Sequence, residues 1–203
     1  IAPVSKFDDY KLQQKIGDHL AALGYYEIMT NSLTSPDYAS LLEENEVDKP
    51  VKMLNPLSND LSVLRQTMLF SGLEAISYNV NRRKPNLKFF EFGKTYHLKG
   101  EQRNEYKHLS LLLTGNRSAE SWAGAERKSD FFYLKSSVTS VLERLGVNNV
   151  AQASVKNSIY SEGLTFSINS KDLVSFGLVK KSLLKPLDIK QPVLYADFNW
   201  DNL

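Results

Sequence analysis

The stretch LNPLSNDLSVLRQTMLFSGLEAISYNVNRRKPNLKFFEFGKTYHL, residues 54–98, decides the fold of this chain. Asn55-Pro56 breaks regular structure near its start. Apolar residues at helical spacing then predict a helix over residues 67–82, and alternating aromatic residues predict a strand over residues 87–98. A glycine inside a strand marks a bulge or a close approach of another group, and Gly93 holds that place here.

The rest of the chain continues this mixture of helices and strands. Asp8 or Asp9 is expected to cap the first helix, Asp130 a later one, and Asn199 a last one. A mostly antiparallel sheet with helices packed on one side, an α+β fold, is therefore predicted. Residues 1–203 are read as a single module that could divide near residues 115–130, a polar stretch. Helices are expected over residues 10–23 and 131–145, and further strands over residues 25–33, 51–54, 108–114, 150–156, 163–168, 173–179 and 193–198.

Composition narrows the function classes. The chain has 203 residues, 42% of them hydrophobic and 24% charged, which is ordinary for a globular domain. The net charge of +2 means that any contact with nucleic acid must come from a local patch. The absence of cysteine excludes disulfides, thiolate metal sites and a cysteine nucleophile. The N-terminus lacks an initiator Met, so a piece of a longer protein is expected, and no apolar run is long enough to span a membrane.

Motifs for catalysis are missing. No G-x-G phosphate loop and no G-x-S-x-G turn occur in the sequence. The three histidines have no metal-ligand spacing: His19 is expected to face solvent, whereas His97 and His108 could face each other across adjacent strands as a polar pair. The aromatic residues of the central strand are assigned to the core. No catalytic, cofactor-binding or metal-binding residue is predicted.

The motifs resemble those of the β subunit family of bacterial phenylalanyl-tRNA synthetases, in their order and spacing as well as their residues. The resemblance covers nearly the whole chain. It departs at residues 160–165, YSEGLT, where the family often has H-P-G-R-x-A. The matching segments are LGYYEI at 23–28, NPLS at 55–58, LRQT at 64–67, NVNR at 79–82, FEFGKTY at 90–96, DFFYLK at 130–135 and the strand at 193–197.

The resemblance implies a class II aminoacyl-tRNA synthetase-like fold that performs no aminoacylation itself. It implies a partner, the catalytic α subunit, in a cytoplasmic (αβ)₂ heterotetramer that aminoacylates tRNA(Phe) with ATP and Mg²⁺. No cofactor is implied for this fragment. An active class II site needs an R-x-[ED] arginine to hold the α-phosphate of ATP, and His97 and Lys99 stand at those positions here. The Glu-Arg pairs at 126–127 and 143–144 lack the glycine-rich context of the third class II motif.

Two surfaces are candidates for contacts. Class II modules pair through a first helix and strand, so we expect a subunit interface there; the alternative is that the apolar stripe of this helix packs on its own sheet. A second reading makes the chain an RNA-binding module, although cations at a helix C-terminus also favour the helix dipole. The interface candidates are Tyr10, Gln13, Ile16, Gly17, Leu20, Tyr26 and Ile28, and the RNA candidates are Arg82, Arg83, Lys84, Lys94, Lys99 and Arg103.

Overall fold

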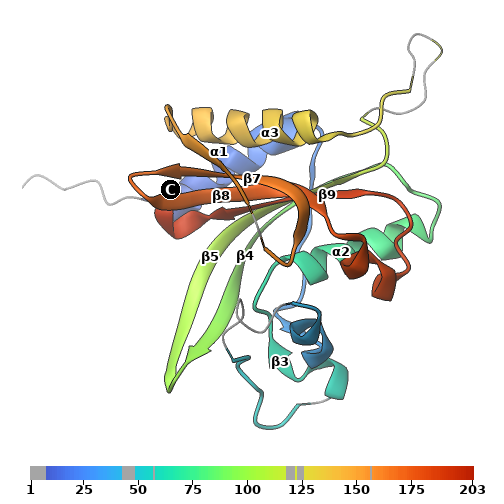
Figure 1. Ribbon diagram of the computed structural model, residues 1–203, viewed down its shortest axis with the longest axis vertical. Helices are drawn as coiled ribbons and strands as arrows, with labels where there is room; N and C mark the ends of the chain where they lie inside the picture. The colour runs from blue at the N-terminus through green and yellow to red at the C-terminus, as the bar shows by residue number, and fades with distance from the viewer. Residues whose placement is uncertain (1–7, 43–48, 57, 118–121, 123–125, 156) are drawn as a thin grey trace, which may run out of the picture.

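The computed structural model describes residues 8–42, 49–56, 58–117, 122, 126–155 and 157–203, and these form an α+β fold (Figure 1). A seven-stranded sheet has the order β1-β4-β5-β9-β8-β7-β6, and a two-stranded sheet pairs β2 with β3. Every neighbouring pair in the large sheet is antiparallel except β1–β4, which is parallel. No helix in the described part of the chain is long and apolar enough to cross a membrane.

The N-terminal part supplies a long helix and short connecting elements. Asp8 caps α1 by accepting a hydrogen bond from the amide of Lys11, and Gly24, at φ +84°, lets the chain turn away after the helix. Asp9 instead binds Lys107 and Trp200. The elements are α1 (Asp9–Ala22), β1 (Tyr26–Glu27), β2 (Leu33–Thr34), η1 (Pro36–Leu41), η3 (Asn59–Leu61) and β3 (Val63–Leu64).

The segment quoted at the outset forms α2 (Leu69–Val80) and β4 (Leu87–Lys99), and β4 pairs with β5 (Gln102–Thr114) over its whole length. The predicted helix and strand are confirmed. The β4–β5 register is continuous, so Gly93 makes no bulge, but a Cβ there would lie 2.3 Å from Met68 Cε and 2.4 Å from Arg65 Nη2. The alternative of a close approach is therefore correct.

The C-terminal part completes the sheet. Asp130 caps α3 as predicted, by accepting from the amide of Tyr133. The strand β9 inserts between β5 and β8, so strands on either side of residues 115–130 are direct neighbours in one sheet. The elements are α3 (Phe131–Arg144), β6 (Ala151–Ser154), β7 (Tyr160–Ile168), β8 (Lys171–Val179), α4 (Lys181–Leu184), η4 (Lys185–Leu187), β9 (Val193–Asn199) and η5 (Trp200–Asn202).

The two faces of the large sheet carry different side chains. Directly opposed residues of an antiparallel pair point to the same face, so Phe90 and Leu111 lie on one face and Glu91 and Ser110 on the other. The first face packs against α1 and α3 through the larger core cluster. The second face packs against α2 and α4 at one end through a second cluster. Helices therefore cover both faces, and the expectation that they pack on one side is wrong (Figure 1).

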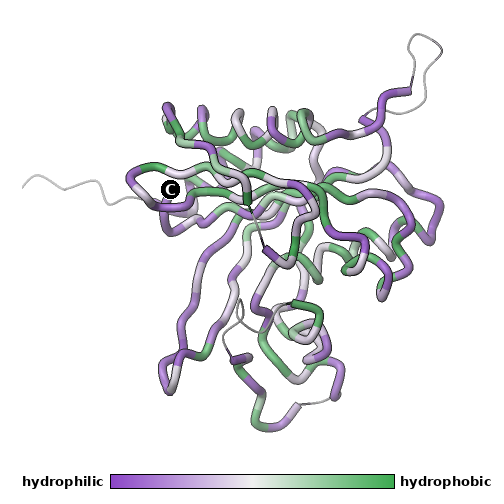
Figure 2. The backbone as a smooth tube through the Cα atoms, in the orientation of Figure 1, coloured by the Kyte–Doolittle hydropathy of each residue, from purple (hydrophilic) through white to green (hydrophobic). Residues whose placement is uncertain are grey.

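Figure 2 shows how hydropathy follows this division. The strands are hydrophobic where they pass between the helices, and the outer end of the β4–β5 hairpin is mostly hydrophilic. This exposed end explains why the second strand was predicted too short, at residues 108–114. Its first half, QRNEYK, has the composition of a loop, but it is held in strand conformation by the partner strand β4. Local propensity gives way here to cross-strand pairing.

Three other expectations are wrong. The strand expected at residues 25–33 stops after Glu27, and the amide of Thr30 donates to the Glu91 carboxylate instead of to a strand neighbour. The stretch 51–54 makes only a single β-bridge, from Lys52 to Val63. Asn199 makes no capping hydrogen bond with its side chain, and the turn after it is the 3-10 helix η5.

Candidate functional site

The end of the polar sheet face that α2 leaves uncovered holds two adjoining cavities, of about 390 and 240 Å³. Asn157, Ile159 and Asp197 line both of them. The larger cavity is also lined by Leu42, Gln66, Thr67, His97 and Ser158, and the smaller by His108, Tyr160, Asp172, Leu173, Val174, Ser175 and Asn199. We call this pair of cavities the polar cleft.

A chain of hydrogen bonds runs through the wall of the polar cleft. His97 Nε2 lies 3.2 Å from Thr95 Oγ1, which lies 2.9 Å from His108 Nε2, and His108 Nδ1 lies 2.7 Å from Asp197 Oδ1. The two histidines are therefore joined through a threonine rather than facing each other directly, since His108 is opposite Gly93 in the register. The two ends of the chain, His97 and Asp197, meet again in the larger cavity.

The environment of the polar cleft shifts several pKa values. Burial lowers the pKa of His108, but the adjacent carboxylate of Asp197 outweighs this, so the net pKa lies above the ordinary value of 6.5. Burial raises the pKa of Tyr160 and that of Tyr195 well above the usual 10. Both tyrosines therefore remain neutral hydroxyl groups, and His108 with Asp197 forms the titratable pair of the site.

A buried ion pair lies beside the polar cleft, on the same sheet face. Arg65 Nη1 is 3.1 Å from Glu91 Oε1, with side chains only 4% and 3% exposed. Thr30 Oγ1 donates to Glu91 and accepts from Arg65, and Arg65 Nε donates to the carbonyl of Lys94. Among the described residues, Arg65 is the buried arginine near the cleft. Its guanidinium is already paired with Glu91, so its positive charge is neutralised within the fold.

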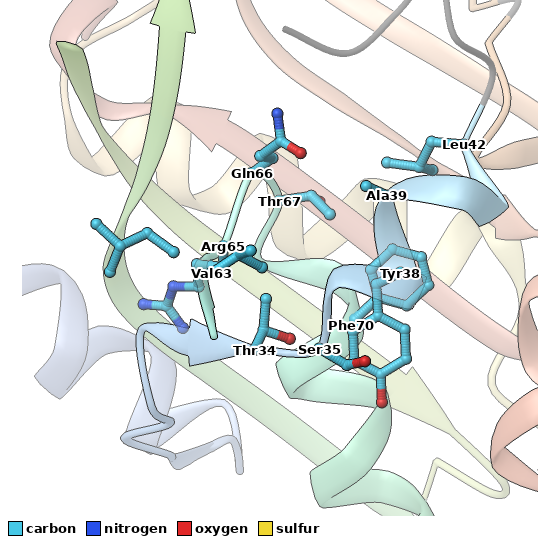
Figure 3. A pocket seen from close by; sticks show the side chains of 11 residues that line it. Thr34, Ser35, Tyr38, Ala39, Leu42, Val63, Arg65, Gln66, Thr67 and Phe70 are labelled. Carbon is cyan, nitrogen blue, oxygen red and sulfur yellow. The ribbon is translucent and has the colours of Figure 1, made fainter. Parts of the chain in front are cut away.

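A smaller cavity lies behind Arg65, between η1 and β3 (Figure 3). Its volume is about 20 Å³, enough for one water molecule and no organic ligand. Tyr38 and Phe70 stack in its wall with ring centroids 4.4 Å apart, as the parallel rings of Figure 3 show. Pairing of this kind fixes η1 against α2, so we assign the cavity to packing.

The described walls of the polar cleft contain no lysine or arginine. His97 lines the larger cavity. Lys99 lies at the exposed end of β4. A phosphate chain needs fixed cations, whereas the described walls offer carboxylates, amides, hydroxyls and two histidines. No group of three or more metal-ligating side chains occurs within the described ranges.

The outer face of α1 and β1 forms a second candidate surface. Tyr10 and Tyr26 are 75% and 73% exposed. A groove of about 400 Å³ between α1 and the sheet is lined by Tyr10, whereas Tyr26 is opposite Phe89 on the edge strand β1 and so points to the other face of the sheet. We call these two tyrosines and the groove the α1–β1 surface. The groove is lined by Tyr10, Gln13, Gln14, Gly17, Asp18, Ala21, Glu27, Phe90 and Phe92.

The predicted interface residues separate into two groups. Tyr10, Gln13 and Gly17 come together on the α1–β1 surface, with Tyr26 exposed on the adjacent strand. Ile16 and Leu20 are 0% exposed and belong to the core cluster of this chain, so the core alternative applies to them. Ile28 is half-buried and packs against the cluster on the opposite sheet face. Ile16 and Leu20 therefore present no side-chain surface to a partner, whereas Ile28 keeps part of its side chain exposed.

The basic residues do not form one patch. Arg82 stacks on Tyr78 at 3.4 Å, and Lys94 pairs with Glu105 at 2.6 Å. Arg83 and Lys84 are exposed just after α2, whereas Lys99 and Arg103 lie at the tip of the β4–β5 hairpin. Figure 1 shows this tip at lower left and α2 on the right of the molecule. The exposed cations without a described partner therefore form two separate pairs, and neither pair alone is a strong binding site for an RNA backbone.

Several residues of the polar cleft were not singled out from the sequence. Asp197 and Asn199 lie in a strand whose other residues are apolar. An acid inside a buried strand, as in VLYADFN, is the signal that could have found them. His19 was expected in solvent, but its Nε2 binds Ser140 Oγ at 2.7 Å and so contacts α3.

Comparison with known proteins identifies the chain's relatives. The sequence profile of the phenylalanyl tRNA synthetase beta chain CLM domain matches residues 2–200. The phenylalanine–tRNA ligase beta subunit of Bacteroides fragilis is 40% identical over 95% of this chain, and that of Porphyromonas gingivalis 34% over 96%. The chain spans about a quarter of the length of these relatives, 25% in each case.

Solved structures place the fold. A pyrrolysyl tRNA synthetase from Desulfitobacterium hafniense superposes with a TM-score of 0.71 over 95% of this chain and 64% of that one, at 19% identity. At that identity the likeness concerns the fold alone, and it confirms the predicted class II synthetase-like architecture. Together, the sheet with its polar cleft, the matched profile and the close relatives show that the chain belongs to the phenylalanyl-tRNA synthetase β chain family, within its CLM domain.

Proposed function

We propose that this chain is a non-catalytic, class II-like module of a phenylalanine–tRNA ligase β subunit, and that it supports assembly with the catalytic α subunit. The single observation that carries the proposal is the combination of a class II synthetase-like fold with a cleft whose described lining has no lysine or arginine. Such a module can still bind a partner subunit when it binds no ATP. The assembly then aminoacylates tRNA(Phe) as a cytoplasmic (αβ)₂ heterotetramer, with ATP and Mg²⁺ bound at the α subunit.

The α1–β1 surface is the proposed contact with the α subunit. The exposed Tyr10 lines a groove that Phe90 and Phe92 also line, and the exposed Tyr26 lies on the adjoining edge strand β1. A Cβ at Gly17 would lie 3.7 Å from the Phe90 ring, an ordinary contact, so only a larger side chain at this position would fill the groove. Large aromatic side chains at the rim of an apolar groove are typical of interface anchors, and an obligate interface buries more than about 2,000 Å².

Co-purification of the full-length β subunit with a tagged α subunit tests this contact. The substitutions Tyr26→Glu and Gly17→Leu should each weaken association at least tenfold, because one adds a charge to the interface and the other fills the groove. Phe132→Glu is the matched control, since Phe132 is 75% exposed on α3, away from this surface. Retention of the α subunit by both variants would refute the assignment of the interface.

The absence of ATP binding is tested separately. Calorimetric titration of the chain with ATP and Mg²⁺ should give no binding at micromolar concentrations, because the cleft lacks a cation for the phosphates. His97→Arg restores a guanidinium at the motif position and is the informative variant. Tight, magnesium-dependent binding by the unaltered chain would show that the module retains an ATP site.

A role in RNA binding is the alternative function. The exposed cations that would serve it are divided between the end of α2 and the β4–β5 tip. Loss of a salt-dependent tRNA complex on neutralising Arg83 and Lys84, with the α1–β1 surface intact, would favour this alternative over the assembly role.

A further inference from the structure

A further cavity, of about 450 Å³, lies at the connection between two neighbouring strands, where the chain leaves β8, forms α4 and η4 and enters β9. Figure 1 shows the orange-red turns of this connection beside α2, and the hydroxyl of Ser77 on α2 donates to the carbonyl of Leu187. We call it the lysine cavity, after Lys181, Lys185 and Lys190, which line it. It shares no described lining residue with the polar cleft or with the groove beside α1.

The walls of the lysine cavity are mainly apolar. Leu178 is half-buried and Pro192 is exposed, so a ligand can reach carbon atoms of both. Leu184 and Ile189 lie deeper and belong to the core cluster beside α2. The amide of Ile189 donates to the carbonyl of Leu184 at 3.1 Å, which fixes the turn that encloses the cavity. Preformed apolar cavities of about 300–1,000 Å³ with a few polar groups are the usual sites of small-molecule ligands.

The three lysines leave the cavity with unbalanced positive charge. Lys190 Nζ lies 3.8 Å from Asp188 Oδ1, a long contact between side chains that are 88% and 76% exposed, and such a pair neutralises little charge. Among the described residues, the ammonium groups of Lys181 and Lys185 have no ion pair or hydrogen bond. The net charge of the whole chain is only +2. The cavity is therefore a local positive site that attracts anions.

The described lining also distinguishes between kinds of anion. It contains no aromatic side chain, so a nucleobase finds no ring to stack on, which single-stranded nucleic acids need. A bare phosphate or an RNA backbone would leave the apolar surface of Leu178 and Pro192 in contact with water. An anion with an aliphatic body matches both features, because its charge lies at the lysines while its carbon atoms cover the apolar wall.

We infer that the lysine cavity binds a small aliphatic carboxylate, with the carboxylate at the ammonium groups of Lys181 and Lys185 and the carbon chain against Leu178 and Pro192. Ammonium groups form charge-assisted hydrogen bonds with carboxylate oxygens, and each methylene group that leaves water adds to the affinity. This binding goes beyond the assembly role and does not depend on it, because the cavity and the groove beside α1 have no described lining residue in common.

The test uses four probes: hexanoate, 1-hexanol, n-hexylamine and acetate. Each is titrated into the assembled synthetase, made from the full-length β subunit and its α subunit, and followed by saturation-transfer NMR. Hexanoate should bind with a Kd on the order of 1 mM, which is in the range for so small a ligand. The other three should bind at least tenfold more weakly, because 1-hexanol and n-hexylamine lack the negative charge and acetate lacks the carbon chain.

Reversal of charge assigns the signal to this cavity. Lys181→Glu and Lys185→Glu should each weaken hexanoate binding at least tenfold, and the double variant should bind n-hexylamine more tightly than hexanoate. Lys171→Glu is the matched control for the single variants, since it changes the net charge by the same amount and Lys171 is exposed at the opposite end of β8. Other sites in the assembly give the same signal in all variants and cancel in the comparison.

Melting temperatures confirm that each variant is folded. If a reversal variant does not fold, Lys181→Gln and Lys185→Gln take its place, with a smaller loss of hexanoate binding in the same direction. Equal binding of hexanoate by the unaltered protein and by both lysine variants would overturn the inference, and so would equal binding of hexanoate and 1-hexanol. Binding of a tRNA transcript that Lys181→Glu abolishes, with no hexanoate signal, would assign these cations to an RNA backbone and would overturn it as well.

Discussion

The two faces of the central sheet share the same strands but use them differently. One face is apolar where α1 and α3 cover it with a continuous core. The other is apolar only under α2 and α4, and beyond them it carries a buried ion pair and then an open polar cleft. Successive residues of a strand point to opposite faces of the sheet. A single strand such as β4, with the sequence FFEFGKTYH, therefore contributes side chains to both faces. The fold thus separates an apolar core from an open polar surface without separate domains.

The strongest test of the polar face is removal of Glu91. Glu91→Ala leaves the Arg65 guanidinium buried without its partner, and we expect the free energy of unfolding to fall by about 3–5 kcal/mol. Urea denaturation measures this loss. Glu105→Ala is the control: its pair with Lys94 has side chains 48% and 46% exposed, so about 0–1 kcal/mol is expected. The double variant Arg65→Met/Glu91→Leu should recover most of the stability; failure to recover would mean that the pair itself stabilises the fold.

The apolar face should respond to loss of volume instead of loss of charge. Leu111→Ala leaves a cavity under α1 and α3 and should lower the free energy of unfolding by about 2–5 kcal/mol. Leu111 is 0% exposed. Leu23→Ala is a suitable control, because Leu23 is 38% exposed at the end of α1. Equal losses from the two substitutions would contradict the location of the core.

A single methyl group tests how closely the polar face is packed. Gly93→Ala places a Cβ against Met68 and Arg65, and the resulting strain should cost about 1–3 kcal/mol. Gly17→Ala is the matched control, because Gly17 has an ordinary φ and the substitution should be tolerated. Gly100 is unsuitable as a control, because its φ of +61° would itself strain an alanine. Thermal melting compares the two; a neutral Gly93→Ala would show that Met68 moves aside.

The smallest expected effect is a pH dependence. The folded-state pKa of His108 is raised, so its pairing with Asp197 contributes stability that is fully present below pH 6.5 and is lost as the pH rises through the folded-state pKa. Urea midpoints measured from about pH 6 to about pH 9 should therefore decline, and Asp197→Asn should flatten the decline. Asp201 acts in the same direction and Arg65 opposes it. An equal slope in Asp197→Asn would assign the effect to other groups.

The helices and most strands could be predicted because they depend on short-range patterns. Asp130 and Gly146 mark the ends of α3, and the apolar period of residues 69–80 marks α2. The end of β1 at Glu27 could not be predicted, because it depends on Glu91, which is 61 positions away from Thr30. The same reason applies to the site: Asp197 and His108 are 89 positions apart in sequence, and only strand pairing brings them together.

By itself, the sequence determined the family, the helices and the class of sheet, since motif order, capping residues and alternation are all local properties of the chain. Only the tertiary structure decided which residues were available for contact. It buried Ile16 and Leu20 in the core while exposing Tyr10 and Tyr26, and it assembled the polar cleft from residues of five strands and the loops between them. The physical reason is that burial depends on what packs against a side chain, and that partner comes from a distant part of the chain.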